Sequence, residues 1–64
     1  MKVYNYFRDR IDAVRYVKVN GGIIKCLVTA DGRVTSNGVQ AVRRGMDMQD
    51  IHIFRYMVEI KIDD

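Results

Sequence analysis

The stretch that decides the fold is residues 12–36, DAVRYVKVNGGIIKCLVTADGRVTS. Asn20-Gly21 lies between two apolar segments, and Asn-Gly is the strongest short signal for a β-hairpin, because a type I′ turn needs positive φ at both central residues. A two-residue turn there pairs Val17 with Ile24 and gathers the apolar side chains on one face. We therefore expect a first strand over residues 13–19, paired with the segment that begins at Gly22.

A second turn follows at Asp31-Gly32. A three-residue loop with Gly32 in the left-handed region pairs Thr29 with Arg33 and puts the valine at position 34 opposite Val28, on the apolar face. A two-residue turn would put polar side chains there instead. The favoured loop makes residues 12–36 a three-stranded antiparallel meander.

A short helix is expected next. Asn37 is a good N-cap, and Gln40 stands three residues later in the position of a capping-box partner. Gly45 fits the residue that ends the helix. The apolar face of this helix consists of Val39, Val42 and Met46. Such a helix, of about two turns, needs to pack on the sheet to be stable.

Residues 51–62 give the clearest strand pattern, because apolar and polar side chains alternate strictly from Phe54 to Ile62. The N-terminal residues 1–12 are ambiguous: Val3–Phe7 has the composition of a strand, which we favour, but a helix is the alternative. The sequence thus predicts one α+β domain, residues 1–64, with a small curled antiparallel sheet and one helix in the order β-β-β-α-β. The predicted core is Val17, Val19, Ile24, Cys26, Val28, Val34, Val39, Val42, Phe54, Tyr56, Val58 and Ile60.

Composition limits the class of protein. The chain has 64 residues, of which 48% are hydrophobic and 30% charged, as in globular domains. One cysteine and one histidine allow neither an intrachain disulfide nor a usual structural zinc site. No apolar run approaches the roughly 20 residues of a membrane span, and the N-terminal residues do not resemble a signal peptide. We expect a cytoplasmic protein with no membrane partner.

Residues suited to catalysis are few. His52 is expected at the rim of the core, at the start of the last strand, and Cys26 is expected to be buried and inert. The glycines at 21 and 22 lie in a hairpin and lack the spacing of a phosphate-binding loop. The sequence therefore predicts a non-enzymatic binding module, with no catalytic residues, no cofactor and no metal.

Nucleic acid is the first partner that the sequence suggests. The segment from Arg8 to Arg44 carries eight basic residues and three acids, whereas the segment from Gly45 onward carries two basic residues and five acids. In the expected hairpin, Tyr16 pairs with Lys25 on the outer face, and sheets that bind single strands combine such cations and aromatic rings. The predicted binding residues, on this sheet face and at the helix end, are Tyr16, Lys18, Lys25, Arg43, Arg44 and Arg55.

A protein partner is the alternative. Tyr, Met and Arg are enriched at protein–protein interfaces, and the chain has four tyrosines and four methionines. A small adaptor or inhibitor acting through a Tyr/Met/Arg surface would fit, and the tiny, proline-free chain resembles products of phages and mobile elements in a general way. The last strand, at about twelve residues, would overhang its neighbours, so a homodimer through this strand is expected.

Overall fold

The structure of the protein, a computed structural model, describes residues 1–63. Along the chain the elements are β1 (Lys2–Phe7), α1 (Arg10–Asn20), β2 (Ile23–Cys26), α2 (Ser36–Arg43), α3 (Met48–Ile53) and β3 (Tyr56–Lys61). The predicted α+β class with an antiparallel sheet is confirmed. The predicted order of elements is wrong, because the chain runs β-α-β-α-α-β.

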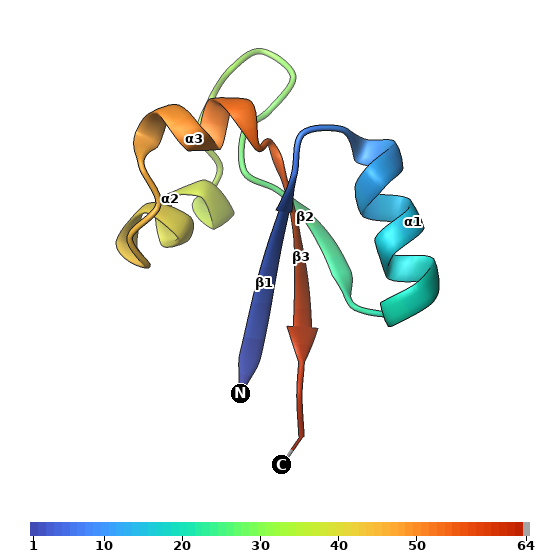
Figure 1. Cartoon of the computed structure of the whole chain (residues 1–64). Helices are drawn as coiled ribbons and strands as arrows, with labels where there is room; N and C mark the ends of the chain where they lie inside the picture. Colours follow the sequence, from blue (N-terminus) through green and yellow to red (C-terminus); the bar gives the residue numbers. More distant parts are fainter. Residues whose placement is uncertain (64) are drawn as a thin grey trace.

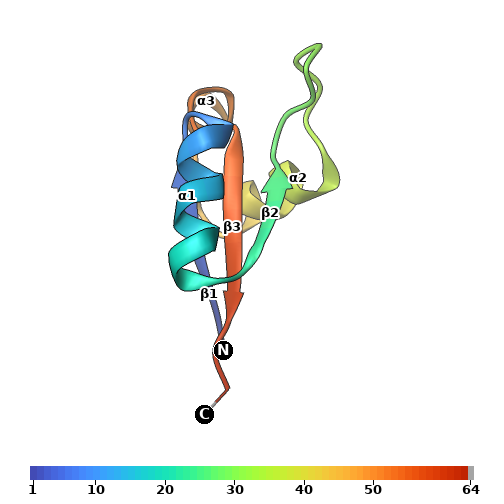
Figure 2. The same cartoon turned by 90° about the vertical axis from the view of Figure 1, so that its right-hand side faces the viewer.

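The last strand, β3, lies in the middle of the sheet. The spatial order is β1-β3-β2, and both neighbours are antiparallel to β3. Figure 2 shows the three strands side by side, with α1 in front of them. The sheet therefore joins the first and last segments of the chain directly.

Helices cover both faces of the sheet. Figure 1 looks toward the β1 edge, with α1 on one side and α2 and α3 on the other. On the α1 side, the Tyr16 ring packs 5.2 Å from the ring of Phe7. On the opposite side, Leu27 and Met57 form a buried cluster with Ala41 of α2 and Ile51 of α3. Both faces of the central strand are consequently buried, with Met57 and Val58 at 2% and 0% exposure.

Residues 13–19 form a helix, so the predicted hairpin at Asn20-Gly21 is wrong. The side chains of Ala13, Tyr16 and Val17 have the spacing of one helical face. Asn20-Gly21 ends this helix: Gly21 has φ 77°, and its N–H donates to the carbonyl of Val17 at 2.7 Å. Positive φ at Gly21 was predicted correctly, but it serves a helix end and not a turn between strands.

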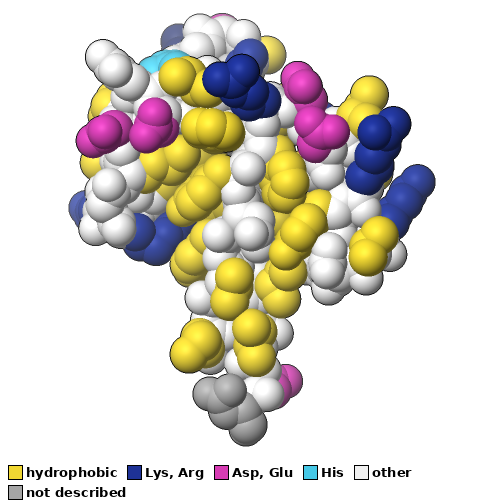
Figure 3. Space-filling model, in the orientation of Figure 1, with side chains coloured by type: hydrophobic (Ala, Val, Ile, Leu, Met, Phe, Trp, Pro, Cys, Tyr) yellow, Lys and Arg dark blue, Asp and Glu magenta, His cyan; other side chains and the backbone are white. Residues whose placement is uncertain are grey.

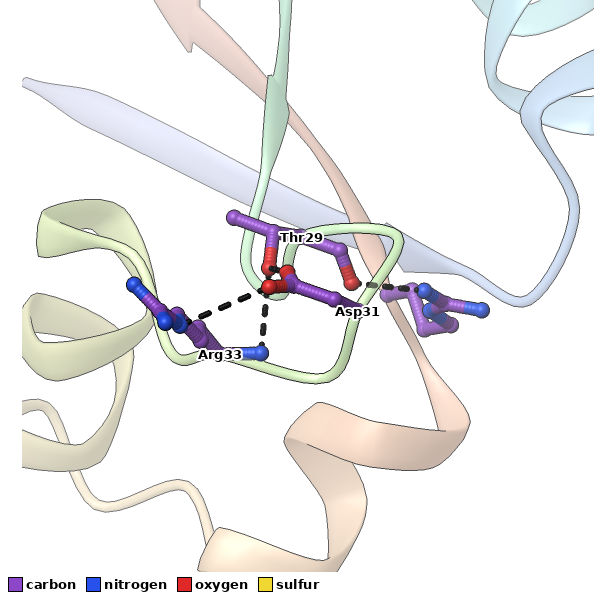
Figure 4. A network of polar contacts seen from close by, with 4 residues as sticks. Thr29, Asp31 and Arg33 are labelled. Carbon is purple, nitrogen blue, oxygen red and sulfur yellow. Dashed lines mark hydrogen bonds and ion pairs between the residues drawn. The ribbon is translucent and has the colours of Figure 1, made fainter.

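The predicted loop between residues 29 and 33 is confirmed. The N–H of Thr29 donates to the carbonyl of Arg33 at 2.8 Å, Gly32 has φ 88°, and an antiparallel bridge joins residues 28 and 34. Polar side chains close the loop (Figure 4): the Asp31 carboxylate accepts from the Thr29 hydroxyl and lies 3.4 Å from Nε of Arg33. The preferred strand over Val3–Phe7 is also confirmed, as part of β1.

The single strand predicted over residues 51–62 is wrong in its first part. Met48–Ile53 is the helix α3, and Ile51 is fully buried in it. The strand β3 has six residues, as many as β1, and is paired on both sides. A homodimer through a long overhanging last strand therefore lacks its structural basis.

The helix expected after residue 36 is present as α2, but Thr35 is its N-cap and not Asn37. The Thr35 side chain accepts from the N–H of Gly38 at 3.1 Å. The Thr35 hydroxyl lies 2.6 Å from the carbonyl oxygen of Cys26, and this contact holds the start of α2 against the end of β2.

The observed core overlaps the predicted core only in part. Val28 and Val58 are buried as predicted, whereas Cys26 is exposed and Val19 is 84% exposed. Val19 is exposed because residues 13–19 form a helix and not a strand, and Cys26 is exposed because it ends the short edge strand β2. The residues that are buried are Ala13, Leu27, Val28, Gly38, Ala41, Ile51, Met57 and Val58.

Gly38→Ala is expected to destabilise the protein although alanine favours helices. A Cβ at this position would lie 2.7 Å from Cγ1 of Val34 and closer still to the carbonyl oxygen of Leu27. Overpacking of this kind costs about 1–3 kcal/mol, which outweighs a gain in helix propensity of about 1 kcal/mol. Thermal unfolding would measure the change, with Gln40→Ala on the exposed side of α2 as the control. A Gly38→Ala variant at least as stable as the parent would contradict the packing of α2.

Candidate binding groove beside the edge strand β1

The outer edge of β1 carries free backbone groups. Met1 and Ile62 exchange two hydrogen bonds, of 2.8 and 3.2 Å, across the β1–β3 pair. Bonded and non-bonded pairs alternate along an antiparallel ladder, so the residues whose N–H and C=O groups point away from β3 are Lys2, Tyr4 and Tyr6. Among residues 1–63, no hydrogen bond to these groups is found. β1 is thus an open sheet edge.

The other edge of the sheet is shorter and partly closed. β2 has four residues, and at its end the carbonyl of Cys26 accepts a hydrogen bond from the Thr35 hydroxyl. The next carbonyl, that of Leu27, accepts the N–H of Thr35 at 3.0 Å. Of the two edges, β1 therefore offers more backbone for a further strand.

A groove of about 540 Å³ lies beside β1 on the side of α2 and α3. Figure 3 looks onto this edge and shows hydrophobic side chains along both sides of the β1 backbone. The lining residues come from β1, from the end of α2 with the turn that follows it, and from α3 with its end: Tyr4, Asn5, Tyr6, Ala41, Arg44, Met46, Asp50 and Phe54. The groove is therefore rich in aromatic rings and has one arginine and one carboxylate.

Arg44 lines the groove and contacts two of its neighbours through its guanidinium. Its guanidinium carbon lies 3.8 Å from the centroid of the Tyr4 ring, and Nη2 donates to Sδ of the buried Met57 at 3.2 Å. Its backbone is fixed too, because Arg44 caps α2 and Gly45 with φ 109° turns the chain away. Stacking on the ring stabilises this position by about 0.5–1 kcal/mol.

Two charged side chains of the groove form no ion pair with the described residues of the chain. Within the described part of the chain, neither Arg44 nor Asp50 takes part in an ion pair. At the far end of the groove, the Arg8 guanidinium lies 5.6 Å from the centroid of the Phe54 ring. The groove thus has fixed charges of both signs that remain open to a ligand.

A lysine patch adjoins the groove on the same face of the sheet. It consists of Lys2, Lys25 and Lys61 around the carboxylate of Glu59, which lies 3.3 Å from Nζ of Lys2 and 3.0 Å from Nζ of Lys25. The hydrogen bond from Lys25, with the contribution of Lys2, lowers the pKa of Glu59 against the opposing effect of burial. Lys61 stands directly across from Lys2, and Glu59 stands across from Tyr4, so the patch meets the groove.

The predicted nucleic-acid residues are divided between the two faces. Tyr16 faces the sheet from α1, where its hydroxyl accepts from Nδ2 of Asn5 at 3.0 Å, so the predicted pairing of Tyr16 with Lys25 is wrong. Lys18 is exposed on the same helix. Lys25 lies on the opposite face of the sheet, in the lysine patch.

The three arginines of the predicted site also have different environments. Both Arg43 and Arg44 are exposed at the end of α2, but only Arg44 lines the groove. Arg55 is half-buried and donates from Nη2 to the carbonyl of Thr29 at 2.9 Å, so it supports the loop. Of the six predicted residues, the structure brings only Lys25 and Arg44 to the sheet face with the groove.

The sequence interpretation missed the residues that shape the groove. Tyr4 and Tyr6 belong to a strand with no proline and with one charge, at Lys2, and this composition was the available signal of an unprotected edge. Asp50 and Phe54 were assigned to the neighbourhood of a long last strand, and only the helix α3 brings them to the groove.

The two residues that the sequence analysis weighed for chemistry, His52 and Cys26, are both exposed. His52 is exposed on α3, and the prediction that Cys26 is buried is wrong, because it lies on the short edge strand β2. Over residues 1–63 no group of three or more potential metal ligands is found, and no helix has the length and apolar character needed to cross a membrane.

Comparisons of the chain with protein-family models, with curated proteins and with solved structures found no match. A function for the chain therefore has to be inferred from its own geometry.

The ion pairs of Glu59 should make stability depend on pH. The folded-state pKa of Glu59 is lowered. The charged carboxylate therefore stabilises the fold at pH values above the unfolded-state pKa of about 4.3, and this stabilisation is lost as the pH falls through the folded-state pKa. Glu59→Gln should therefore be less stable than the parent at neutral pH, and the difference should vanish in acid.

Urea unfolding of both proteins between neutral and acidic pH would measure this difference. In a Lys25→Gln background the effect of Glu59→Gln should be smaller, since the main cause of the pKa shift is gone. A destabilisation that stays constant with pH would show that the carboxylate acts through packing and not through its charge.

Proposed function

We propose that this chain is a non-enzymatic module that binds a protein partner by adding an extended segment of the partner to the edge of β1. The observation that carries the proposal is that the same two residues form part of the free edge and part of the groove lining. Tyr4 and Tyr6 expose their backbone N–H and C=O groups at the free edge, and the same residues line the groove. Backbone bonding and side-chain selection thus converge on one strand.

An extended polypeptide fits this arrangement by its chemistry. Free groups at successive alternate residues of an edge strand match the donors and acceptors of another strand. In such strand addition, the main chain supplies affinity and the pockets for alternate side chains supply specificity. A partner residue opposite Tyr4 or Tyr6 would direct its side chain to the groove face, since cross-strand neighbours share a face. In this proposal the tyrosine, methionine and arginine side chains that contact the partner are those of Tyr4, Tyr6, Arg44 and Met46, which line the groove.

Selection of peptides tests the proposal. A random library of blocked octapeptides would be screened against the whole chain, labelled with a fluorophore at Cys26, which is exposed on the opposite edge of the sheet. Selected peptides should bind the parent, and N-methylation of their amides should abolish binding only at alternate positions, those that face β1.

A matched pair of variants isolates the backbone bond. Tyr4→Val and Tyr4→Pro both remove the ring, but only proline removes the N–H at the free edge, a change that an edge strand tolerates. Binding should fall at least about tenfold further in Tyr4→Pro, the equivalent of a lost net hydrogen bond of about 1.4 kcal/mol. Equal binding by the two folded variants, or a library that yields no binder, would overturn the proposal.

Nucleic-acid binding is the second candidate, and the lysine patch favours it. The patch has three lysines and one carboxylate, that of Glu59, which pairs with Lys2 and Lys25. Lys61 stands directly opposite Lys2 in the sheet, where like charges repel. A phosphate backbone would relieve this repulsion. The neighbouring Tyr4 ring and Arg44 at the end of α2 extend the same face.

Salt dependence tests this candidate. In fluorescence-anisotropy titrations with single- and double-stranded oligonucleotides, Lys25→Gln and Lys61→Gln should each lower the salt slope by about one unit. Lys18→Gln should leave it unchanged, because Lys18 lies on the helix that covers the opposite face. Absence of binding at about 50 mM salt, where phosphate contacts are strong, would eliminate nucleic acid.

A further inference from the structure

The geometry points to a particular charge pattern in the bound segment: a carboxylate and a cation two residues apart, the carboxylate paired with Arg44 and the cation with Asp50. This inference rests on the proposed strand addition to β1 and names the chemistry of the partner. It begins from two groove charges that the described residues leave without an ion pair.

Arg44 is prepared to bind a carboxylate. A guanidinium has five N–H donors in a fixed plane, and the hydrogen bond to Met57 engages Nη2 alone. The guanidinium carbon lies 3.8 Å from the centroid of the Tyr4 ring, so the side chain has two fixed contacts before a ligand arrives. Arginine in this state forms two parallel hydrogen bonds with a carboxylate, at little further cost in conformational entropy.

The register of strand addition selects which residue of the segment reaches Arg44. A residue opposite Tyr4 on the free edge has its Cβ about 4.5–5.5 Å from that of Tyr4 and on the same face. A glutamate or aspartate there would lie beside the ring on which Arg44 is stacked. The acidic position of the segment is therefore the one opposite Tyr4.

Asp50 supplies the second charge, nearer the other end of β1. It lies on α3, which Figure 1 places beyond the C-terminal end of β1, and it lines the groove together with Tyr6. Its carbonyl accepts the N–H of Phe54 at 2.7 Å, and Arg8, the residue after β1, covers the Phe54 ring. A residue opposite Tyr6 points into this part of the groove, and a lysine or arginine there complements Asp50.

A second copy of this chain does not meet the requirement. β1 reads KVYNYF, and it contains no acidic residue. If two β1 strands paired antiparallel through their free groups about Tyr4, each would present tyrosine opposite Tyr4 and Lys2 opposite Tyr6. Arg44 would then face no carboxylate. The charges of the groove therefore select a segment of a different polypeptide.

Blocked hexapeptides with the central triplets Lys-Val-Glu, Glu-Val-Lys, Gln-Val-Gln, Lys-Val-Lys and Glu-Val-Glu would test the pattern. Both orders of opposite charge are included because the segment can run in either direction. The better of the two should bind at least about tenfold tighter than the neutral peptide, as expected for a charge-assisted pair. The peptides with two like charges should bind more weakly than the better of the two peptides with opposite charges.

A double-mutant cycle ties the preference to Arg44. Replacing Glu by Gln in the best peptide should lower its affinity for the parent at least about tenfold. The same replacement should change its affinity for the Arg44→Gln variant only a little. Arg43→Gln is the matched control, because Arg43 is its exposed neighbour outside the groove. If Arg44→Gln unfolds, Arg44→Lys keeps the charge without the planar pair and should lose most of the preference. Asp50→Asn should remove the preference for lysine alone.

The outcomes separate this inference from the proposed function. If library peptides bind with the expected loss in Tyr4→Pro but opposite charges give no advantage, the charge pattern is wrong and strand addition stands. If no peptide binds the parent, both are wrong. Dimerisation of the parent in sedimentation, abolished by Tyr4→Pro, would mean that a second copy occupies the edge, and this too would overturn the inference.

Discussion

The backbone pairing of β3 between β1 and β2 is the constraint on which the rest of the structure depends. β3 comes last along the chain but lies between the other two strands, so β1 and β2 have no strand to pair with until β3 is in place. Its two neighbours are joined through α1, which has to cross one face of the sheet. The connection between β2 and β3 runs through α2 and α3 on the other face. Two layers of helices and one open edge, β1, follow from this single arrangement.

The position of β3 between β1 and β2 also explains which parts of the fold could be predicted from the sequence. The turn at residues 29–33, the strand at Val3–Phe7 and the helix α2 depend on local signals, and each was found. Residues 13–20 carry apolar side chains that suit both a two-residue and a 3.6-residue period, and Asn-Gly both ends helices and turns hairpins. Tertiary contacts, with Tyr16 bonded to Asn5 and packed on Phe7, decide for the helix. Such contacts cannot be derived from a window of the sequence.

The candidate site was less accessible to prediction for the same reason. Tyr4 and Tyr6 are visible in the sequence, but their position on an open edge depends on pairing with residues more than 50 positions away. Burial of both faces of β3 by helices removed the expected outer surface, so Met57 became core and its sulfur became an acceptor for Arg44. Basic composition alone could not distinguish Lys18 from Lys25, which lie on opposite sides of the sheet.

An open edge such as β1 requires a physical explanation. Natural sheets protect exposed edges with lysine, proline, bulges or a covering segment, because unpaired strands promote aggregation. β1 has no proline, and its one charged side chain, Lys2, is drawn across the sheet to Glu59. Apart from Asn5, the rest of the strand consists of aromatic and β-branched residues beside an aromatic groove. An edge strand of this composition carries the smallest risk of aggregation when another strand pairs with it for much of the protein's lifetime. The lack of protection and the shape of the groove therefore lead to the same inference, an edge that is completed by another polypeptide.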